Sequence, residues 1–157
     1  MISRIGRWEL DLDPVLTADC FARYPNDALC TCEGCRNFRA LGESSFPVQF
    51  RALAAQLGID LGKPSELSHY GEPGELRLLD GWFHLVGRIF SGRDAWRQVG
   101  EMAWTADTDP LYGLSGLGFT DRIALLPEAF KGHPVVQLEF QTKVPWVLPD
   151  SGGSGVN

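Results

Sequence analysis

Polar and apolar residues alternate at the start of the chain, and this pattern predicts a strand over residues 4–13. Trp8, Leu10 and Leu12 occupy every second position, with charged residues between them. Alternation with a period of two places apolar side chains on one face of a strand and polar side chains on the other. Pro14 follows at once, so we expect the strand to end there.

Two short helices are predicted between residues 33 and 58. The first covers 33–41 and would end at Gly42, because glycine favours the position that follows a helix C-terminus. The second begins at Pro47, a residue that suits a first helical turn. Its apolar face consists of Phe46, Phe50, Leu53 and Leu57. Gly58 would end this helix, with Ile59 folding back onto it.

Asp80-Gly81 lies between two apolar runs, which is the signature of a tight β-hairpin turn. Pairing outward from that turn places Arg77 opposite His84. One face of the hairpin would then belong to the core. The other would be a polar surface formed by Arg77, Trp82, His84 and Arg88, and we interpret it as the surface that contacts a partner.

Further strands are predicted over 118–126 and 134–143, followed by an extended apolar segment over 144–148. Residues 91–117 give no clear pattern. We therefore expect residues 1–149 to form a single α+β domain. It would contain a largely antiparallel sheet, with two short helices on one face beside a zinc-binding loop over 19–35. Residues 150–157 are rich in glycine and serine and are predicted to be disordered.

Composition and charge exclude several classes of function. The 157 residues carry a net charge of −6, which argues against nucleic acid as a partner because duplex binding requires a basic face. No apolar run approaches the ~20 residues that span a bilayer. The charged N-terminal segment also lacks the apolar stretch of a signal peptide. We therefore expect a cytoplasmic protein with no membrane contact.

All four cysteines, Cys20, Cys30, Cys32 and Cys35, fall within one short segment with the spacing C-x9-C-x-C-x2-C. Cytosolic thiols stay reduced, so such a cluster is more typical of a metal site than of disulfides. Zinc suits thiolate ligands in tetrahedral geometry, whereas the spacing matches none of the usual ferredoxin patterns. Unliganded thiols remain the alternative.

Cys20 is the predicted fourth ligand, and His69, His84 and His133 are alternatives to it. Four cysteines would close the coordination shell and make the zinc structural. A catalytic zinc needs an open position for water or substrate. The sequence therefore favours a structural role for the metal.

The run Cys30-Thr31-Cys32-Glu33-Gly34-Cys35-Arg36, followed by Gly42 and Phe46, resembles one zinc-binding segment of glutathione-dependent formaldehyde-activating enzymes. The resemblance covers under twenty residues and implies zinc-dependent carbon–sulfur lyase activity. The upstream C-x-C-G and downstream C-x-x-C of that family are missing here.

A second resemblance extends over most of the chain. The C-x-C-x-x-C-x-N-F motif that begins at Cys30, the stretch from Gly81 to Gly87, and Val144-Pro145-Trp146-Val147-Leu148 are similar to a family of uncharacterised bacterial proteins. This resemblance implies a standalone bacterial domain of about this size, without an assigned activity.

The leading hypothesis is a non-enzymatic zinc-stabilised domain that binds another protein or a small ligand. Two alternatives remain. One is a zinc-dependent enzyme such as a carbon–sulfur lyase of the formaldehyde-activating type. The other is an immunity-type protein that neutralises a toxin, which the acidic, tryptophan-rich composition suggests.

Overall fold

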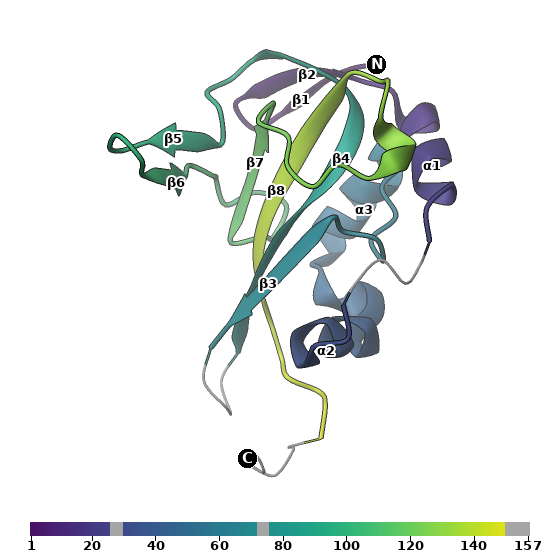
Figure 1. Cartoon of the computed structure of the whole chain (residues 1–157), viewed down its shortest axis with the longest axis vertical. Helices are drawn as coiled ribbons and strands as arrows, with labels where there is room; N and C mark the ends of the chain where they lie inside the picture. Colours follow the sequence, from purple (N-terminus) through teal and green to yellow (C-terminus); the bar gives the residue numbers. More distant parts are fainter. Residues whose placement is uncertain (26–29, 72–75, 150–157) are drawn as a thin grey trace.

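A long central strand, β4 (Arg77–Ser91), organises the sheet of this computed structural model, which describes residues 1–25, 30–71 and 76–149 (Figure 1). The other strands of the main sheet are β1 (Ile2–Ile5), β2 (Trp8–Leu12), β3 (Glu66–Tyr70), β7 (Gly116–Thr120) and β8 (Val135–Val144). Every pair is antiparallel. β8 follows β4 over ten residue pairs, while β2 and β3 take opposite ends of the other edge of β4. The predicted α+β class with a largely antiparallel sheet is thus confirmed.

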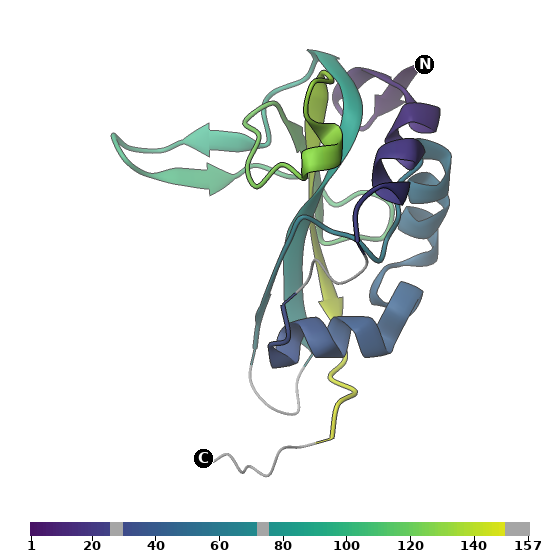
Figure 2. The same ribbon diagram turned by 45° about the vertical axis from the view of Figure 1, so that its right-hand side comes forward.

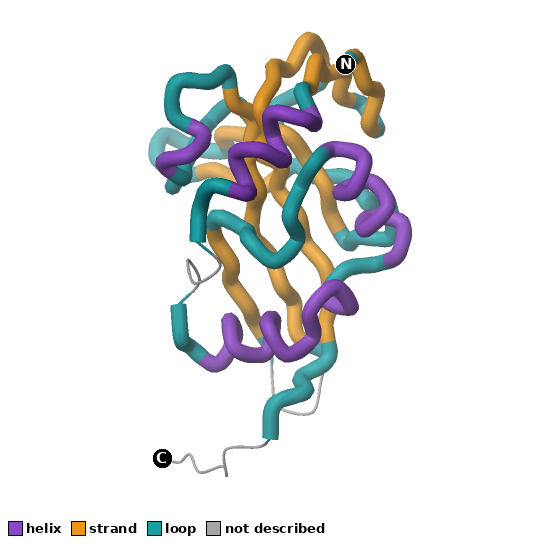
Figure 3. The backbone as a smooth tube through the Cα atoms, turned by 90° about the vertical axis from the view of Figure 1, so that its right-hand side faces the viewer, coloured by secondary structure: helices purple, strands orange, loops and turns teal. Residues whose placement is uncertain are grey.

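Within the described residues, three α-helices cover one face of this sheet (Figures 2 and 3). They are α1 (Pro14–Ala22), α2 (Glu33–Leu41) and α3 (Val48–Leu57), with short 3-10 turns η1 (Gly42–Ser45) and η2 (Glu128–Phe130). Aromatic rings fill the space between the helices and the sheet, and the Phe46 and Phe140 ring centroids lie 5.2 Å apart. Edge contacts of this kind add to the energy of apolar burial. The core therefore forms on the helical side.

Both predicted helices are confirmed, and the end of α3 is as expected. Gly58 adopts a left-handed conformation with φ of 78°. The N–H of Ile59 then donates to the carbonyl oxygen of Ala54 at 2.9 Å, as in a Schellman motif.

The structure differs from prediction at the N-terminus. The predicted strand over 4–13 is a hairpin, because the chain turns at Gly6, where φ is 58°. Residues 19–22, predicted to lie in a loop, belong instead to helix α1. Asp13 fixes the start of this helix, because its carboxylate accepts the N–H of Leu16 at 2.9 Å. Asp followed by proline is a regular helix start.

The predicted hairpin turn at Asp80-Gly81 is wrong, because β4 runs straight through it. Gly81 instead allows the backbone of β3 to pack closely against β4. A Cβ at this position would lie 2.0 Å from the carbonyl oxygen of Glu66 in β3. Glycine in a strand interior often marks such a close backbone approach.

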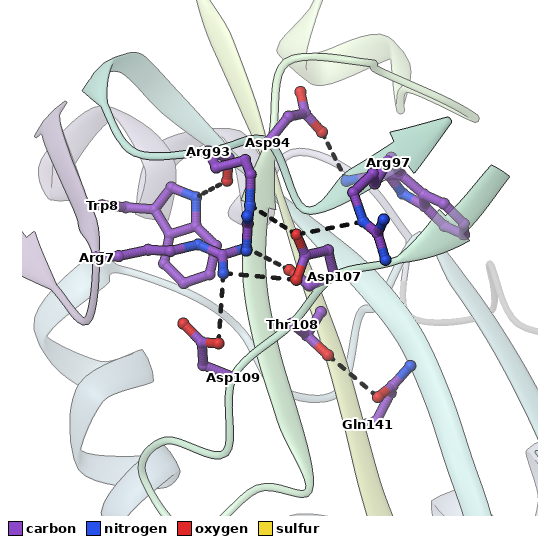
Figure 4. A network of polar contacts seen from close by, with 10 residues as sticks. Arg7, Trp8, Arg93, Asp94, Arg97, Asp107, Thr108, Asp109 and Gln141 are labelled. Carbon is purple, nitrogen blue, oxygen red and sulfur yellow. Dashed lines mark hydrogen bonds and ion pairs between the residues drawn. The ribbon is translucent and has the colours of Figure 1, made fainter. Parts of the chain in front are cut away.

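Residues 91–117 contain a separate hairpin of β5 (Trp96–Gln98) and β6 (Trp104–Ala106), which projects from the sheet on the side away from the helices (Figure 2). Its base is tied to the N-terminal hairpin (Figure 4). Asp107 forms ion pairs with Arg7, Arg93 and Arg97, and the Trp8 indole N–H donates to the Arg93 carbonyl oxygen at 2.9 Å.

Two predictions fall outside the described residues: the tail over 150–157, and residues 26–29 of the zinc-binding loop. Among the helices of the described ranges, none is long and apolar enough to cross a membrane.

Candidate metal centre

Three of the four cysteines meet at the start of α2. The sulfur atoms of Cys30, Cys32 and Cys35 all lie within 4.8 Å of one another, so this group can hold a metal ion. The Cys30 sulfur is 3.0 Å from that of Cys32 and 3.3 Å from that of Cys35. A disulfide would need about 2.05 Å, and all three are free thiols. Sulfurs around a tetrahedral zinc lie roughly 3.8 Å apart, given a Zn–S bond of about 2.3 Å, so a small outward shift admits a metal.

The helix itself positions this group. Cys32 is the N-cap of α2, and its sulfur accepts the backbone N–H of Cys35 at 3.4 Å. The positive end of a helix dipole favours a thiolate at this position. From the other end of the same helix, Arg39 donates to the carbonyl oxygen of Cys30 at 2.9 Å. The stretch that carries Cys30 is therefore held against α2.

The thiols differ in acidity. Hydrogen bonding with Cys32, together with smaller contributions from Cys35 and Arg39, lowers the pKa of Cys30. Burial, reinforced by the neighbouring thiols, raises the pKa of Cys35 to about 12. The Cys30 thiol thus ionises more readily than the Cys35 thiol, and a bound metal would have to displace the proton of Cys35. Such competition makes metal affinity fall as the pH falls.

A buried asparagine connects the cysteine group to the end of the sheet. Asn37 is 3% exposed. Its amide nitrogen donates to the carbonyl oxygen of Pro145 at 3.1 Å, and its amide oxygen accepts the N–H of Val147 at 2.8 Å. No metal-ligand or catalytic motif marks Asn37 as a site residue. Its sequence signal is its place beside Phe38 in the C-x-C-x-x-C-x-N-F motif that begins at Cys30.

His69 of β3 packs against the first turn of α2, beside the cysteine group. A Cβ on Gly34 would lie 2.0 Å from His69 Nε2, so the imidazole lies directly against the helix turn between Cys32 and Cys35. The ring also packs on Trp146, at a centroid distance of 5.9 Å. Its Nδ1 atom is buried and has no hydrogen-bond partner in the part of the chain that the structure describes. His69 lies outside the group of three thiols that are mutually within 4.8 Å.

The structure does not bring Cys20 to this group, contrary to the prediction. Cys20 lies on α1, is fully buried and belongs to the hydrophobic core. Burial raises the pKa of its thiol. The reason is that residues near Cys20 form a helix instead of a loop, and this helix turns the thiol toward the sheet.

Two of the alternative histidines also lie elsewhere. His84 is fully buried in β4, where it contacts Ser65 Oγ at 2.7 Å and Gln137 Oε1 at 3.0 Å. Burial lowers the pKa of His84 to about 4. His133 lies in the turn that leads into β8, and its backbone N–H donates to Phe130.

The predicted contact surface of Arg77, Trp82, His84 and Arg88 does not form. Because β4 is continuous, alternation places Arg77 on the opposite face from the other three. Arg77 lies over the Trp146 ring at 4.5 Å, whereas His84 is buried and the Trp82 indole donates to the carbonyl oxygen of Ala124 at 3.0 Å. Arg88 is the one exposed member.

We compared the chain with protein-family models, curated protein sequences and solved structures, and found no match. The resemblance to the uncharacterised bacterial family and the local resemblance to formaldehyde-activating enzymes therefore stay predictions.

Proposed function

We propose that this chain is a non-enzymatic domain that is stabilised by one structural zinc ion and binds another protein or a small ligand. The convergence of Cys30, Cys32 and Cys35 at the N-terminus of α2 carries the proposal. Thiolates in a tetrahedral arrangement favour zinc over magnesium or calcium, which prefer oxygen ligands.

His69 is the proposed fourth ligand in place of Cys20. Three observations support it: the contact of its ring with Gly34, the buried and unpartnered Nδ1 atom, and the packing of the ring on Trp146. Three cysteines and one histidine are a regular structural zinc set. A zinc ion held in this way would join α2, β3 and the segment after β8.

One observation favours an enzyme as the second candidate. Only three thiols converge among the described residues, and Cys30 and Cys32 are exposed. Water in the fourth position would give the open coordination of a catalytic zinc. The identity of the fourth ligand therefore separates the two candidates.

Metal analysis of the purified protein tests the structural site. We expect one zinc per chain in the wild type and loss of zinc in Cys32→Ser. Cys20→Ser is the matched control and should keep its zinc, because that thiol lies in the core. Less than ~0.3 metal per chain in the metal-replete wild type would contradict the proposal, since structural sites hold zinc tightly.

X-ray absorption at the zinc edge tests the fourth ligand. We expect a shell of three sulfurs and one nitrogen, with the outer-shell scattering of an imidazole ring, and His69→Ala should remove that imidazole scattering and leave an oxygen ligand. A wild-type shell of three sulfurs and one oxygen would favour the enzymatic candidate instead.

A further inference from the structure

A cavity of about 180 Å³ opens on the face of the sheet opposite the helices. The acid–aromatic pocket, as we name it, is lined chiefly by Tyr70, Asp80, Trp82, Trp96, Glu139 and Gln141. The strands β3, β4 and β8 form its floor, and Trp96 belongs to the projecting β5–β6 hairpin (Figure 2). The pocket is separate from the cysteine group, which lies with α2 on the helical side.

Two carboxyl groups give this pocket its charge. Glu139 is only 7% exposed, and its pKa is raised by burial and by the nearby carboxylates of Asp80 and Asp94, against hydrogen bonds from Gln137 and Trp96. Burial also raises the pKa of Asp80. Within the described ranges, no lysine, arginine or histidine lines the pocket, and neither Asp80 nor Glu139 belongs to an ion pair. Buried carboxylates normally require a positive partner.

Tyrosine and tryptophan side chains form part of the pocket walls, and hydrogen bonds hold the Trp82 ring and the Trp96 backbone. The Trp82 indole N–H donates to the carbonyl oxygen of Ala124 at 3.0 Å, and the backbone N–H of Trp96 donates to Asp94 at 2.7 Å. Aromatic faces attract cations through their electron-rich centres. Carboxylates and tryptophans together therefore select a positively charged organic group over a neutral or anionic one.

The size and bonding of the pocket narrow the choice of cation. Ordinary small-molecule sites occupy about 300–1,000 Å³, so 180 Å³ suits a group the size of a side chain. One oxygen of Glu139 already accepts a hydrogen bond from Gln137, which leaves fewer free lone pairs for the two-point contact that guanidinium groups prefer. A compact ammonium needs no such fork.

We infer that the acid–aromatic pocket binds an alkylammonium group, carried either by a lysine side chain or by a small free amine. The inference rests on the proposed binding role and specifies its ligand. Because both carboxyls must be ionised to attract the ammonium, binding should weaken as the pH falls.

Titration of the zinc-loaded full chain, followed by tryptophan fluorescence, tests the inference. Nα-acetyl-lysine amide and 1,5-diaminopentane are the probes, and Nα-acetyl-norleucine amide is the neutral control. We expect saturable binding of an amine and none of the norleucine compound. Asp80→Asn and Glu139→Gln should each weaken amine binding at least ~10-fold, whereas Glu101→Gln, an exposed acid outside the pocket, should not.

The two probes distinguish the sources of the ammonium. Tighter binding of the lysine compound supports a protein partner, and tighter binding of the diamine supports a free amine. No saturable amine binding up to ~10 mM, or binding undiminished in Asp80→Asn, overturns the inference. Zinc content is measured on the same samples. Zinc present without amine binding rejects the pocket alone, while zinc absent rejects the proposed zinc-stabilised domain.

Discussion

The cysteine group and the acid–aromatic pocket lie on opposite faces of one sheet and are built in different ways. The cysteine group lies at the end of a nine-residue helix, and two of its three thiols are exposed. The pocket lies on three paired strands, and its deepest carboxyl is almost fully buried. Sheet hydrogen bonds thus preorganise the pocket, whereas the proposed zinc ion would add rigidity to the cysteine group. Removal of the metal should therefore disturb the structure of the cysteine group more than it weakens ligand binding at the pocket.

The strand β3 belongs to both regions. Ser68 and Tyr70 face the pocket, while His69, between them, faces α2. Alternation along a strand places neighbours on opposite faces. A change that displaces β3 should damage both regions, and a change confined to one face should damage one.

Displacement of β3 is the largest expected effect. Gly81→Ala would drive a Cβ against the Glu66 carbonyl oxygen, and overpacking of this kind costs about 3 kcal/mol. We expect urea unfolding to show that loss, and both zinc retention and amine binding to weaken. Gly100→Ala is the matched control, since its Cβ would meet only Ala103 at 3.6 Å. Weakening of one function alone would argue against the shared role of β3.

Removal of the amide of Asn37 should affect the cysteine group alone. Asn37→Ala deletes two hydrogen bonds to the backbone of residues 145–147, each of which is worth about 1 kcal/mol. We expect a loss of about 2 kcal/mol, faster hydrogen exchange in α2 and weaker zinc retention, with amine binding unchanged. Gln56→Ala, at an exposed position of α3, provides the control. Equal loss of amine binding would show that the two regions are not independent.

Lowering the pH should reduce the stability of the fold through His84, which lies on the pocket side of the sheet. The Nε2 atom of His84 contacts Gln137 Oε1 while Gln137 Nε2 donates to Glu139, so His84 carries its proton on Nε2 and is neutral. The folded pKa of about 4 lies below the ordinary 6.5. Between these values the unfolded chain binds a proton that the folded chain does not, so stability is full above pH 6.5 and falls as the pH decreases toward 4.

The slope of this loss is at most about 1.4 kcal/mol per pH unit. The raised pKa of Glu139 acts in the opposite sense in acid, because its folded state keeps a proton that the unfolded chain loses. Comparing the wild type with His84→Gln therefore separates the contribution of His84 to the pH dependence of stability from that of Glu139. Urea unfolding at pH 6.5 and 5 should show a smaller decrease in the variant. An identical decrease would mean that His84 titrates normally.

The smallest expected effect concerns the base of the β5–β6 hairpin. Asp107→Asn weakens the ion pairs to Arg7, Arg93 and Arg97, two of which involve largely exposed arginines, so we expect about 1 kcal/mol. Because Trp96 lies on this hairpin, amine affinity should fall a few-fold while zinc content stays the same. Asp121→Asn, at an exposed position, should change neither quantity. Unaltered amine affinity in Asp107→Asn would show that the hairpin does not position Trp96.

Patterns of nearby residues in the sequence predicted the two helices and the grouping of three of the four cysteines. Helical spacing gave both predicted helices, and cysteine spacing correctly grouped Cys30, Cys32 and Cys35, because ligands within one short segment must lie close together. Cys20 was misassigned because it lies close to the other cysteines in sequence but not in space. It belongs to helix α1, which points its thiol into the core.

The wrong prediction of a turn at Gly81 shows why the remaining parts of the fold and the pocket could not be predicted from the sequence. Asp-Gly between apolar runs has the same composition whether the chain turns there or another strand packs on it. Only the position of β3 decides between the two, and that position depends on pairing such as that of Leu67 with Gly81, 14 residues apart. The pocket depends on the same long-range pairing, since its residues come from β3, β4, β5 and β8.

The bonds from Asn37 to the segment after β8 set an order of events during synthesis. Asn37 and Val147 are 110 residues apart, so a ribosome that adds about 5–20 residues per second emits the second roughly 5 to 20 s after the first. During that interval the three thiols are already made, yet the segment that fastens their helix does not exist. A nascent chain therefore presents Cys30, Cys32 and Cys35 before the sheet closes on their helix, and under the proposed structural role it can acquire its zinc ion during that interval.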